Sequence, residues 1–150
     1  MDPRCRDVCP IVAREFVTAD RALGAAATQV EMVGIDVNPH YLGRRWLRAF
    51  DAEHGLSALP NWHFVTGTLA QLRRVWQAYN ITVQVNPKTK DISHTTVIDF
   101  IGPSGRLHAV AAPYARARHG QAYLPAGLLG RWGSRIAGQL RRLLPDHSGR

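Results

Sequence analysis

Apolar residues alternate along this chain between helical spacing and short strand-like runs, and this alternation most constrains the fold. Helical spacing runs over residues 10–24 and again over 42–55, with Trp46 on the predicted inner face. Between them, residues 29–35 form an apolar run typical of a largely buried strand. A second short strand is predicted over 62–65. Helices that alternate with strands in this way indicate an α/β layered domain.

The second half of the chain continues this order. Thr68 and Gln71 have the spacing of a capping box, which predicts a helix that carries Tyr79 inward. A weak strand over 82–85 and a two-stranded hairpin over 95–110 follow. The order helix, strand, helix, strand, helix, hairpin and helix therefore predicts a mixed sheet flanked by helices.

The tail, residues 127–150, is predicted to be separate from the main domain, residues 1–126. It contains a helical pattern with apolar side chains on one side and arginines elsewhere. Such a helix either packs on the sheet and shows its arginines to water, or rests on an anionic membrane surface through residues 128–144. The apolar positions are Leu128, Leu129, Trp132, Ile136, Leu140 and Leu143.

Composition limits the classes of function. The chain has 150 residues, 45% of them apolar, which suits one compact domain. The net charge of +8 raises the question of nucleic acid or an anionic membrane as a partner. However, the arginines are scattered, and no basic stripe is interleaved with aromatic residues. We therefore expect a solubilising arginine surface and no nucleic-acid partner.

The two cysteines, Cys5 and Cys9, are the most informative chemical feature. Pro10 follows them and fits the first position of a helix, whose N-terminus would stabilise a thiolate. The pair could form a disulfide or hold a soft metal ion. Two thiolates suit Cu(I), and a third nitrogen ligand would let the site hold Cu(II) as well, whereas a structural zinc site would want four protein ligands. The alternative is two ordinary cysteines on a buried turn.

His94 is the strongest candidate for a third ligand among seven histidines. It follows a polar loop, residues 86–91, and is predicted to open the first strand of the second-half hairpin. In a thioredoxin-like topology the loop that enters this strand lies against the cysteine turn. The other histidines are interpreted as ordinary surface or element-end residues, and these are His40, His54, His63, His108, His119 and His147.

Three segments together resemble a known family, the Sco/SenC copper proteins. Cys5-Arg6-Asp7-Val8-Cys9-Pro10 is similar to the family's C-x-D-V-C-P signature. Ile92-Ser93-His94-Thr95-Thr96-Val97-Ile98 resembles its histidine segment, and Val33-Gly34-Ile35-Asp36 followed by Pro39 resembles the strand-Asp-Pro element between them. The resemblance covers roughly residues 2–112.

The resemblance implies a thioredoxin-like fold that binds Cu(I) or Cu(II) through Cys5, Cys9 and His94. Asp7 and Asp36 match acidic positions that support the site without ligating the metal. It also implies a role as metallochaperone, or as thiol reductant, in assembling the binuclear copper site of cytochrome c oxidase. The partner would be the copper-site subunit of that enzyme or another copper protein, in an extracytoplasmic, membrane-associated setting.

The start of the chain departs from the family pattern. Family members have a β-hairpin and a central apolar strand before the first cysteine, together with a membrane anchor or signal. This sequence begins four residues before Cys5 and shows neither a signal pattern nor a spanning segment. We therefore expect an N-terminally shortened version of a longer protein, whose sheet lacks that hairpin and strand.

Two other classes of function stay open. In the first, the protein is a thiol-disulfide oxidoreductase in which Cys5 and Cys9 cycle and His94 only tunes them. In the second, it is a basic binding module that acts through the tail. No peroxidatic cysteine motif, nucleotide-binding loop or hydrolase motif is present in the sequence.

Overall fold

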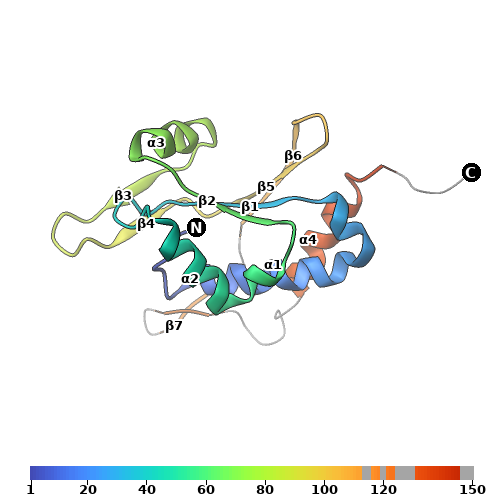
Figure 1. Cartoon of the computed structure of the whole chain (residues 1–150), viewed down its shortest axis with the longest axis horizontal. Helices are drawn as coiled ribbons and strands as arrows, with labels where there is room; N and C mark the ends of the chain where they lie inside the picture. Colours follow the sequence, from blue (N-terminus) through green and yellow to red (C-terminus); the bar gives the residue numbers. More distant parts are fainter. Residues whose placement is uncertain (113–115, 119–120, 124–130, 146–150) are drawn as a thin grey trace, which may run out of the picture.

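A computed structural model describes residues 1–112, 116–118, 121–123 and 131–145 (Figure 1). The α-helices are α1 (Val8–Leu23), α2 (Arg44–His54), α3 (Leu69–Ala78) and α4 (Arg131–Arg141), and two 3-10 helices cover Gly24–Gln29 and Leu56–Ala58. The strands are β1 (Met32–Ile35), β2 (Trp62–Val65), β3 (Val83–Val85), β4 (Ile92–His94), β5 (Ile98–Ile101), β6 (Leu107–Ala111), β7 (Arg116–Arg118) and β8 (Gln121–Tyr123).

The strands associate in pairs. β1 runs parallel to β2, whereas β3 with β4, β5 with β6 and β7 with β8 form antiparallel pairs. The prediction of a mixed arrangement of strands between helices is therefore confirmed. The described strands form four separate ladders, however, and α1 is the first element of the chain.

One face of α1 carries the main core. Its buried side chains include Cys9, Val12, Phe16 and Ala19, and they belong to the same cluster as residues of β1, β2 and α4. Figure 1 shows α1 and α4 side by side on one side of β1 and β2, with α3 on the other side. A second, smaller core beneath α3 is formed by Val37, Leu72 and Trp76. Helices α1 and α4 thus cover one face of β1, and the segment that follows β1 packs beneath α3.

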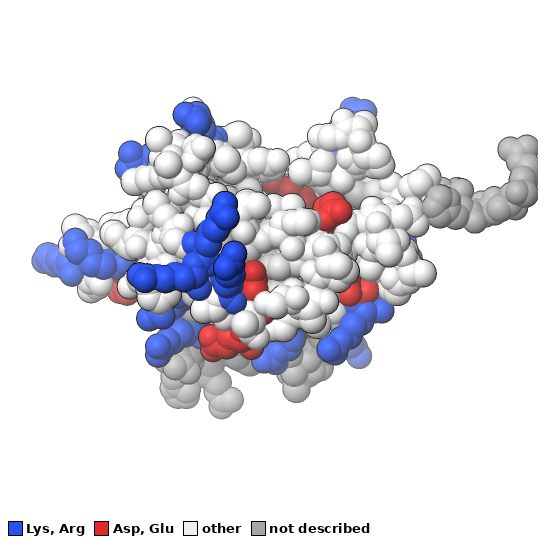
Figure 2. Space-filling model, in the orientation of Figure 1, with Lys and Arg blue, Asp and Glu red and all other residues white. Residues whose placement is uncertain are grey.

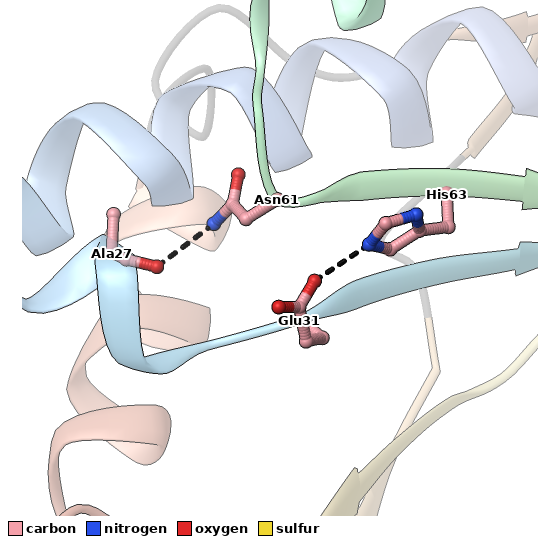
Figure 3. Close-up of polar contacts among 4 residues, drawn as sticks. All are labelled: Ala27, Glu31, Asn61 and His63. Carbon is pink, nitrogen blue, oxygen red and sulfur yellow. Dashed lines mark hydrogen bonds and ion pairs between the residues drawn. The ribbon is translucent and has the colours of Figure 1, made fainter.

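Polar contacts join the residues at the start of β1 to those at the start of β2 (Figure 3). The Asn61 side-chain amide donates to the carbonyl oxygen of Ala27 at 3.1 Å, and the His63 ring lies 2.6 Å from the Glu31 carboxylate. The backbone N–H of Met32 also donates to the carbonyl of Asn61 at 2.8 Å. These contacts support the parallel register, in which Met32 lies opposite Trp62.

A groove of about 550 Å³ lies between β1 and β5. Cys9, His94 and Met1 line it together with residues of β1, β5 and α4. Met1 extends the β1 ladder at the end of the groove, because its amine donates to the carbonyl of Ile35 at 2.5 Å and its own carbonyl accepts from the N–H of Val37 at 3.1 Å. The groove therefore joins the cysteine turn to the histidine segment.

The structure corrects several predicted boundaries. The strand predicted over 29–35 begins only at Met32, because the 3-10 helix continues to Gln29. It is buried on one face only, and Val33 is 52% exposed beside the groove. His94 ends β4 and does not open the following strand, which begins at Ile98. The short pair β7 and β8 was not predicted from the sequence.

Two aromatic side chains predicted to face inward lie at the surface. Tyr79 is 42% exposed because α3 ends at Ala78 and the chain turns away at Asn80, whose φ is 53°. Trp46 is half-buried and contacts Tyr41 and two arginines instead of the core. The capping box at Thr68 and Gln71 is confirmed.

Helix α4 packs against α1, with Trp132, Ile136 and Ala137 buried. The buried carboxylate of Glu15 accepts from the N–H of Gly133 at 2.6 Å, which satisfies a free donor in the first turn of α4. Leu128 and Leu129 lie outside the described residues, as does the predicted boundary between 1–126 and 127–150.

The contact between α1 and α4 requires glycine at position 133. A Cβ there would lie 2.6 Å from both the Glu15 carbonyl oxygen and the Thr18 Cβ, whereas a Cβ at Gly138 meets nothing within 4 Å. We predict that Gly133→Ala lowers the free energy of unfolding by about 1–3 kcal/mol. Gly138→Ala should raise it by up to about 1 kcal/mol, since alanine favours a helix. Urea unfolding measures both, and equal effects would contradict this packing.

Candidate functional site

The two cysteines lie at the start of α1 in different environments. Cys5 precedes the helix and is half-buried, whereas Cys9 lies in the first helical turn and is 2% exposed. Both are free thiols. Each sulfur accepts a backbone N–H at 3.4 Å, Cys9 from Asp2 and Cys5 from Asp7. The turn thus places one accessible and one buried sulfur side by side at a helix N-terminus, as the spacing predicted.

The thiol pair holds one proton tightly and releases the other easily. The Cys9 thiol donates a hydrogen bond to the Cys5 sulfur, and this bond lowers the pKa of Cys5 to about 6. Partial burial opposes the shift, whereas hydrogen bonds from the backbone N–H groups of Cys9 and Asp7 add to it. The same hydrogen bond to Cys5, together with burial, raises the pKa of Cys9 far above its ordinary value. At neutral pH the pair carries a thiolate on Cys5 and a proton on Cys9.

His94 lies at the end of β4 and is partly buried. Burial lowers the pKa of its imidazole, and the positive Met1 amine adds to this effect. Its Nδ1 lies 2.8 Å from the carbonyl oxygen of Thr95, which can only accept, so Nδ1 carries the proton and donates. The lone pair of Nε2 is then available, which is the state in which an imidazole binds a metal.

A buried polar network ties the cysteine turn to the end of β1. Asp36 is fully buried, and its carboxylate accepts from the N–H of Asn38 at 2.9 Å and from the Thr66 hydroxyl at 3.0 Å. The Asn38 amide donates to the Asp2 carboxylate at 2.8 Å. Burial raises the pKa of Asp36 although both hydrogen bonds oppose this shift. Asp36 therefore supports the cysteine turn through Asn38.

The structure gathers part of the predicted ligand set. Cys5 and Cys9 lie together, and Cys9 shares the groove with His94. In the described part of the chain, no group of three histidine, cysteine or carboxylate side chains is close enough to hold a metal ion. Asp7 is exposed at the N-cap of α1 and contributes its backbone N–H to Cys5.

Two contributors were missed by the sequence analysis. Asn38 was not among the predicted site residues, but it is 3% exposed and its side-chain amide donates to the Asp2 carboxylate. The Met1 amine is buried, which lowers its pKa, and it lies at the end of the groove. An Asn-Pro pair indicates a turn, and nothing in the local pattern shows that the amide will be buried.

Comparisons with known proteins identify the family of the chain. A sequence model of the SCO1/SenC family matches residues 3–124. The chain belongs to the SCO1/SenC family. No curated protein matches its sequence.

Solved structures from this family share the fold. ScoI of Bradyrhizobium japonicum with copper bound is 23% identical, with a TM-score of 0.71 over 95% of this chain and 80% of that one. Apo Sco1 of Thermus thermophilus is 20% identical, with a TM-score of 0.66 over 95% and 75% of the two chains. A SCO1/SenC family lipoprotein of Bacillus anthracis is also 20% identical, with a TM-score of 0.62 over 95% and 77%. The predicted thioredoxin-like class of fold is confirmed.

None of the helices in the described residues is both long and apolar enough to cross a membrane.

The shared proton predicts how Cys5 will react. The rate of alkylation by iodoacetamide should rise with pH about a midpoint near 6, the pKa of Cys5, because only the thiolate reacts. In Cys9→Ala the midpoint should move upward toward that of an ordinary thiol, since the Cys9 hydrogen bond is lost. An unchanged midpoint in this variant would show that Cys9 does not stabilise the thiolate.

The same shift predicts a pH dependence of stability. The pKa of Cys5 is lower in the folded state, so folding releases a proton between about pH 6 and the ordinary thiol pKa. The contribution of Cys5 to the free energy of unfolding should be fully present above the upper pKa and be lost as the pH falls through about 6. Urea unfolding of the reduced protein should show this rise relative to Cys5→Ala. A constant difference between the two proteins across this range would contradict it.

Proposed function

We propose that this protein binds copper through Cys5, Cys9 and His94. The observation that carries the proposal is the pair of free thiols at the start of α1, in a chain of the SCO1/SenC family, with the pKa of Cys5 lowered by its hydrogen bond from Cys9. Thiolate is the ligand that Cu(I) prefers, and an imidazole nitrogen in addition suits Cu(II). The copper-bound structure of Bradyrhizobium japonicum ScoI supports copper as the metal.

The donor set fits such an ion. Cys5 offers a sulfur that is already deprotonated, and Cys9 would give up its proton when the metal binds. His94 offers Nε2, because Nδ1 is held by Thr95. Since the three side chains do not form a ready cluster, we propose that the cysteine pair receives the ion first and that His94 joins afterwards.

The biological role that we propose is metallochaperone in the assembly of the binuclear copper site of cytochrome c oxidase. Its partner would be the copper-site subunit of that enzyme or another copper protein. Family membership supports this role, and the lipoprotein of Bacillus anthracis supports an extracytoplasmic, membrane-associated setting. Contact of residues 128–144 with a membrane surface stays a prediction.

A second candidate is thiol-disulfide exchange. It is favoured by the asymmetry of the pair, with a half-buried thiolate at Cys5 and a buried, protonated Cys9 that could resolve a mixed disulfide. In this reaction the Cys5 thiolate attacks a disulfide of the partner, and Cys9 then displaces the partner's sulfur as a thiolate. The protein ends with a Cys5–Cys9 disulfide, and the partner gains two electrons.

Copper titration separates the two candidates. We predict one tightly bound copper ion per chain and, with Cu(II), a thiolate-to-copper charge-transfer band. Cys5→Ala, Cys9→Ala and His94→Ala should each weaken the affinity at least about a hundredfold, because each removes a ligand. His63→Ala is the matched control, since this histidine is exposed and paired with Glu31.

The opposite result is equally clear. The copper proposal fails if the reduced protein binds no copper while the oxidised protein exchanges its Cys5–Cys9 disulfide with thiols at a measurable reduction potential. The oxidoreductase function would then replace it. If His94→Ala keeps full affinity and an unchanged spectrum, His94 is not a ligand.

A further inference from the structure

A stack of arginine and aromatic side chains includes Arg4, the residue that precedes Cys5 in the chain. The guanidinium of Arg4 lies 5.1 Å from the ring centroid of Trp46 and 5.4 Å from that of Tyr41. The guanidinium of Arg45 lies 4.8 Å from the Trp46 ring. The Tyr41 and Trp46 rings meet edge to face with their centroids 5.1 Å apart. We call these four residues, Arg4, Tyr41, Trp46 and Arg45, the arginine–tryptophan platform.

The platform holds two cations that have no anion of their own. Arg4 and Arg45 are exposed, and neither forms an ion pair or a side-chain hydrogen bond within the described part of the chain. The nearby Asp2 carboxylate is already engaged by the N–H of Arg4 and the amide of Asn38. Stacking on an aromatic face leaves the guanidinium edges free to donate to a carboxylate.

The stability of α2 does not explain the platform. Arg45 lies in the first turn of this helix. That turn contains no acidic residue, and a cation there opposes the helix dipole. Arg44 and Arg48 on the same helix are also exposed. Figure 2 shows lysine and arginine side chains gathered on this face, over the start of α2 and the N-terminal segment. Because cations are concentrated where the helix gains nothing from them, a role in binding accounts for them better.

Trp46 is the second feature that points to a binding surface. The sequence pattern placed it in the core, but it is half-buried, and two guanidiniums lie over its ring. A tryptophan flanked by arginines is typical of the residues that dominate protein–protein interfaces. The thiolate that must meet a partner, Cys5, is the next residue in the chain after Arg4.

We propose that the arginine–tryptophan platform docks the partner protein, and that this partner presents carboxylates around the thiol or copper site that it brings to Cys5. This deepens the proposed function and rests on it, because either copper transfer or disulfide exchange requires a partner's sulfur to reach Cys5. Paired guanidiniums on a rigid aromatic support fit the directional, bidentate bonds of carboxylates, which favours an acidic protein surface over a diffuse lipid charge.

The test uses two synthetic peptides and no copper. Both carry one cysteine joined by a disulfide to thionitrobenzoate. In one the cysteine is flanked by glutamates, and in the other by glutamines. The Cys5 thiolate attacks the peptide sulfur, the new bond joins Cys5 to the peptide, and thionitrobenzoate leaves with the electron pair and is followed by its absorbance. The neutral peptide reports the intrinsic reactivity of Cys5, so the ratio of the two rates isolates docking.

We expect the acidic peptide to react faster at low salt and to lose this advantage at about 0.2 M salt. The variant Arg4→Gln/Arg45→Gln should reduce the ratio of rates about tenfold. The matched control is Arg73→Gln/Arg74→Gln, which removes the same charge from exposed positions on α3 and should keep the ratio within about twofold. Thermal unfolding shows whether both variants remain folded.

Three results would overturn the proposal. The first is a ratio of rates near one for the wild-type protein. The second is an equal fall of this ratio in both double variants, which would mean that the acidic peptide is attracted by the net charge of +8 and not by the platform. The third comes from vesicles of phosphatidylcholine and phosphatidylglycerol. If Arg4→Gln/Arg45→Gln abolishes vesicle binding but keeps the ratio of rates, this surface binds membranes instead of an acidic protein. Failure of copper binding, by contrast, would leave this ratio measurable and would count against the proposed function alone.

Discussion

The buried side chain and backbone of Asp36 hold together the segments on which the site depends. Its carboxylate accepts from the N–H of Asn38 and the hydroxyl of Thr66, and its carbonyl oxygen accepts from the Trp76 indole at 2.8 Å. Its N–H donates to the carbonyl of Val65 at 3.0 Å. One residue thus joins the ends of β1 and β2 to α3. An unpaired carboxylate at full burial would be costly, so these contacts must form together.

The cysteine turn depends on this arrangement indirectly, through Asn38 and Asp2. Asn38, fixed by Asp36, holds the Asp2 side chain, and the backbone N–H of Asp2 in turn donates to the Cys9 sulfur. Cys9 is therefore restrained both by the helix and by the end of β1. Cys5 accepts only from the Cys9 thiol and from backbone N–H groups of its own turn, and it stays half-buried. This difference in restraint and burial makes the two thiols chemically unequal.

The sequence predicted most elements because their signals are local. The capping box at Thr68 and the glycine that ends α2, Gly55 with φ of 78°, lie where the pattern placed them. The cysteine pair and its position at a helix start were predictable for the same reason. Trp46 was misplaced because helical spacing cannot distinguish a core face from a face stacked by arginines. Asn38 and Glu15 were missed because burial of a polar group is decided by partners far away in the chain.

The two halves of the proposed copper site differ in how firmly they are held. The cysteine half is built into α1 and tied to β1, whereas His94 ends β4, which pairs only with β3 among the described strands. Since the three side chains do not form a cluster, part of the binding free energy must bring His94 toward the sulfurs. An ion held by the cysteines alone would bind less tightly and would be easier to pass on. In the proposed site the cysteines would therefore hold the ion first, and His94 would be the ligand most easily released.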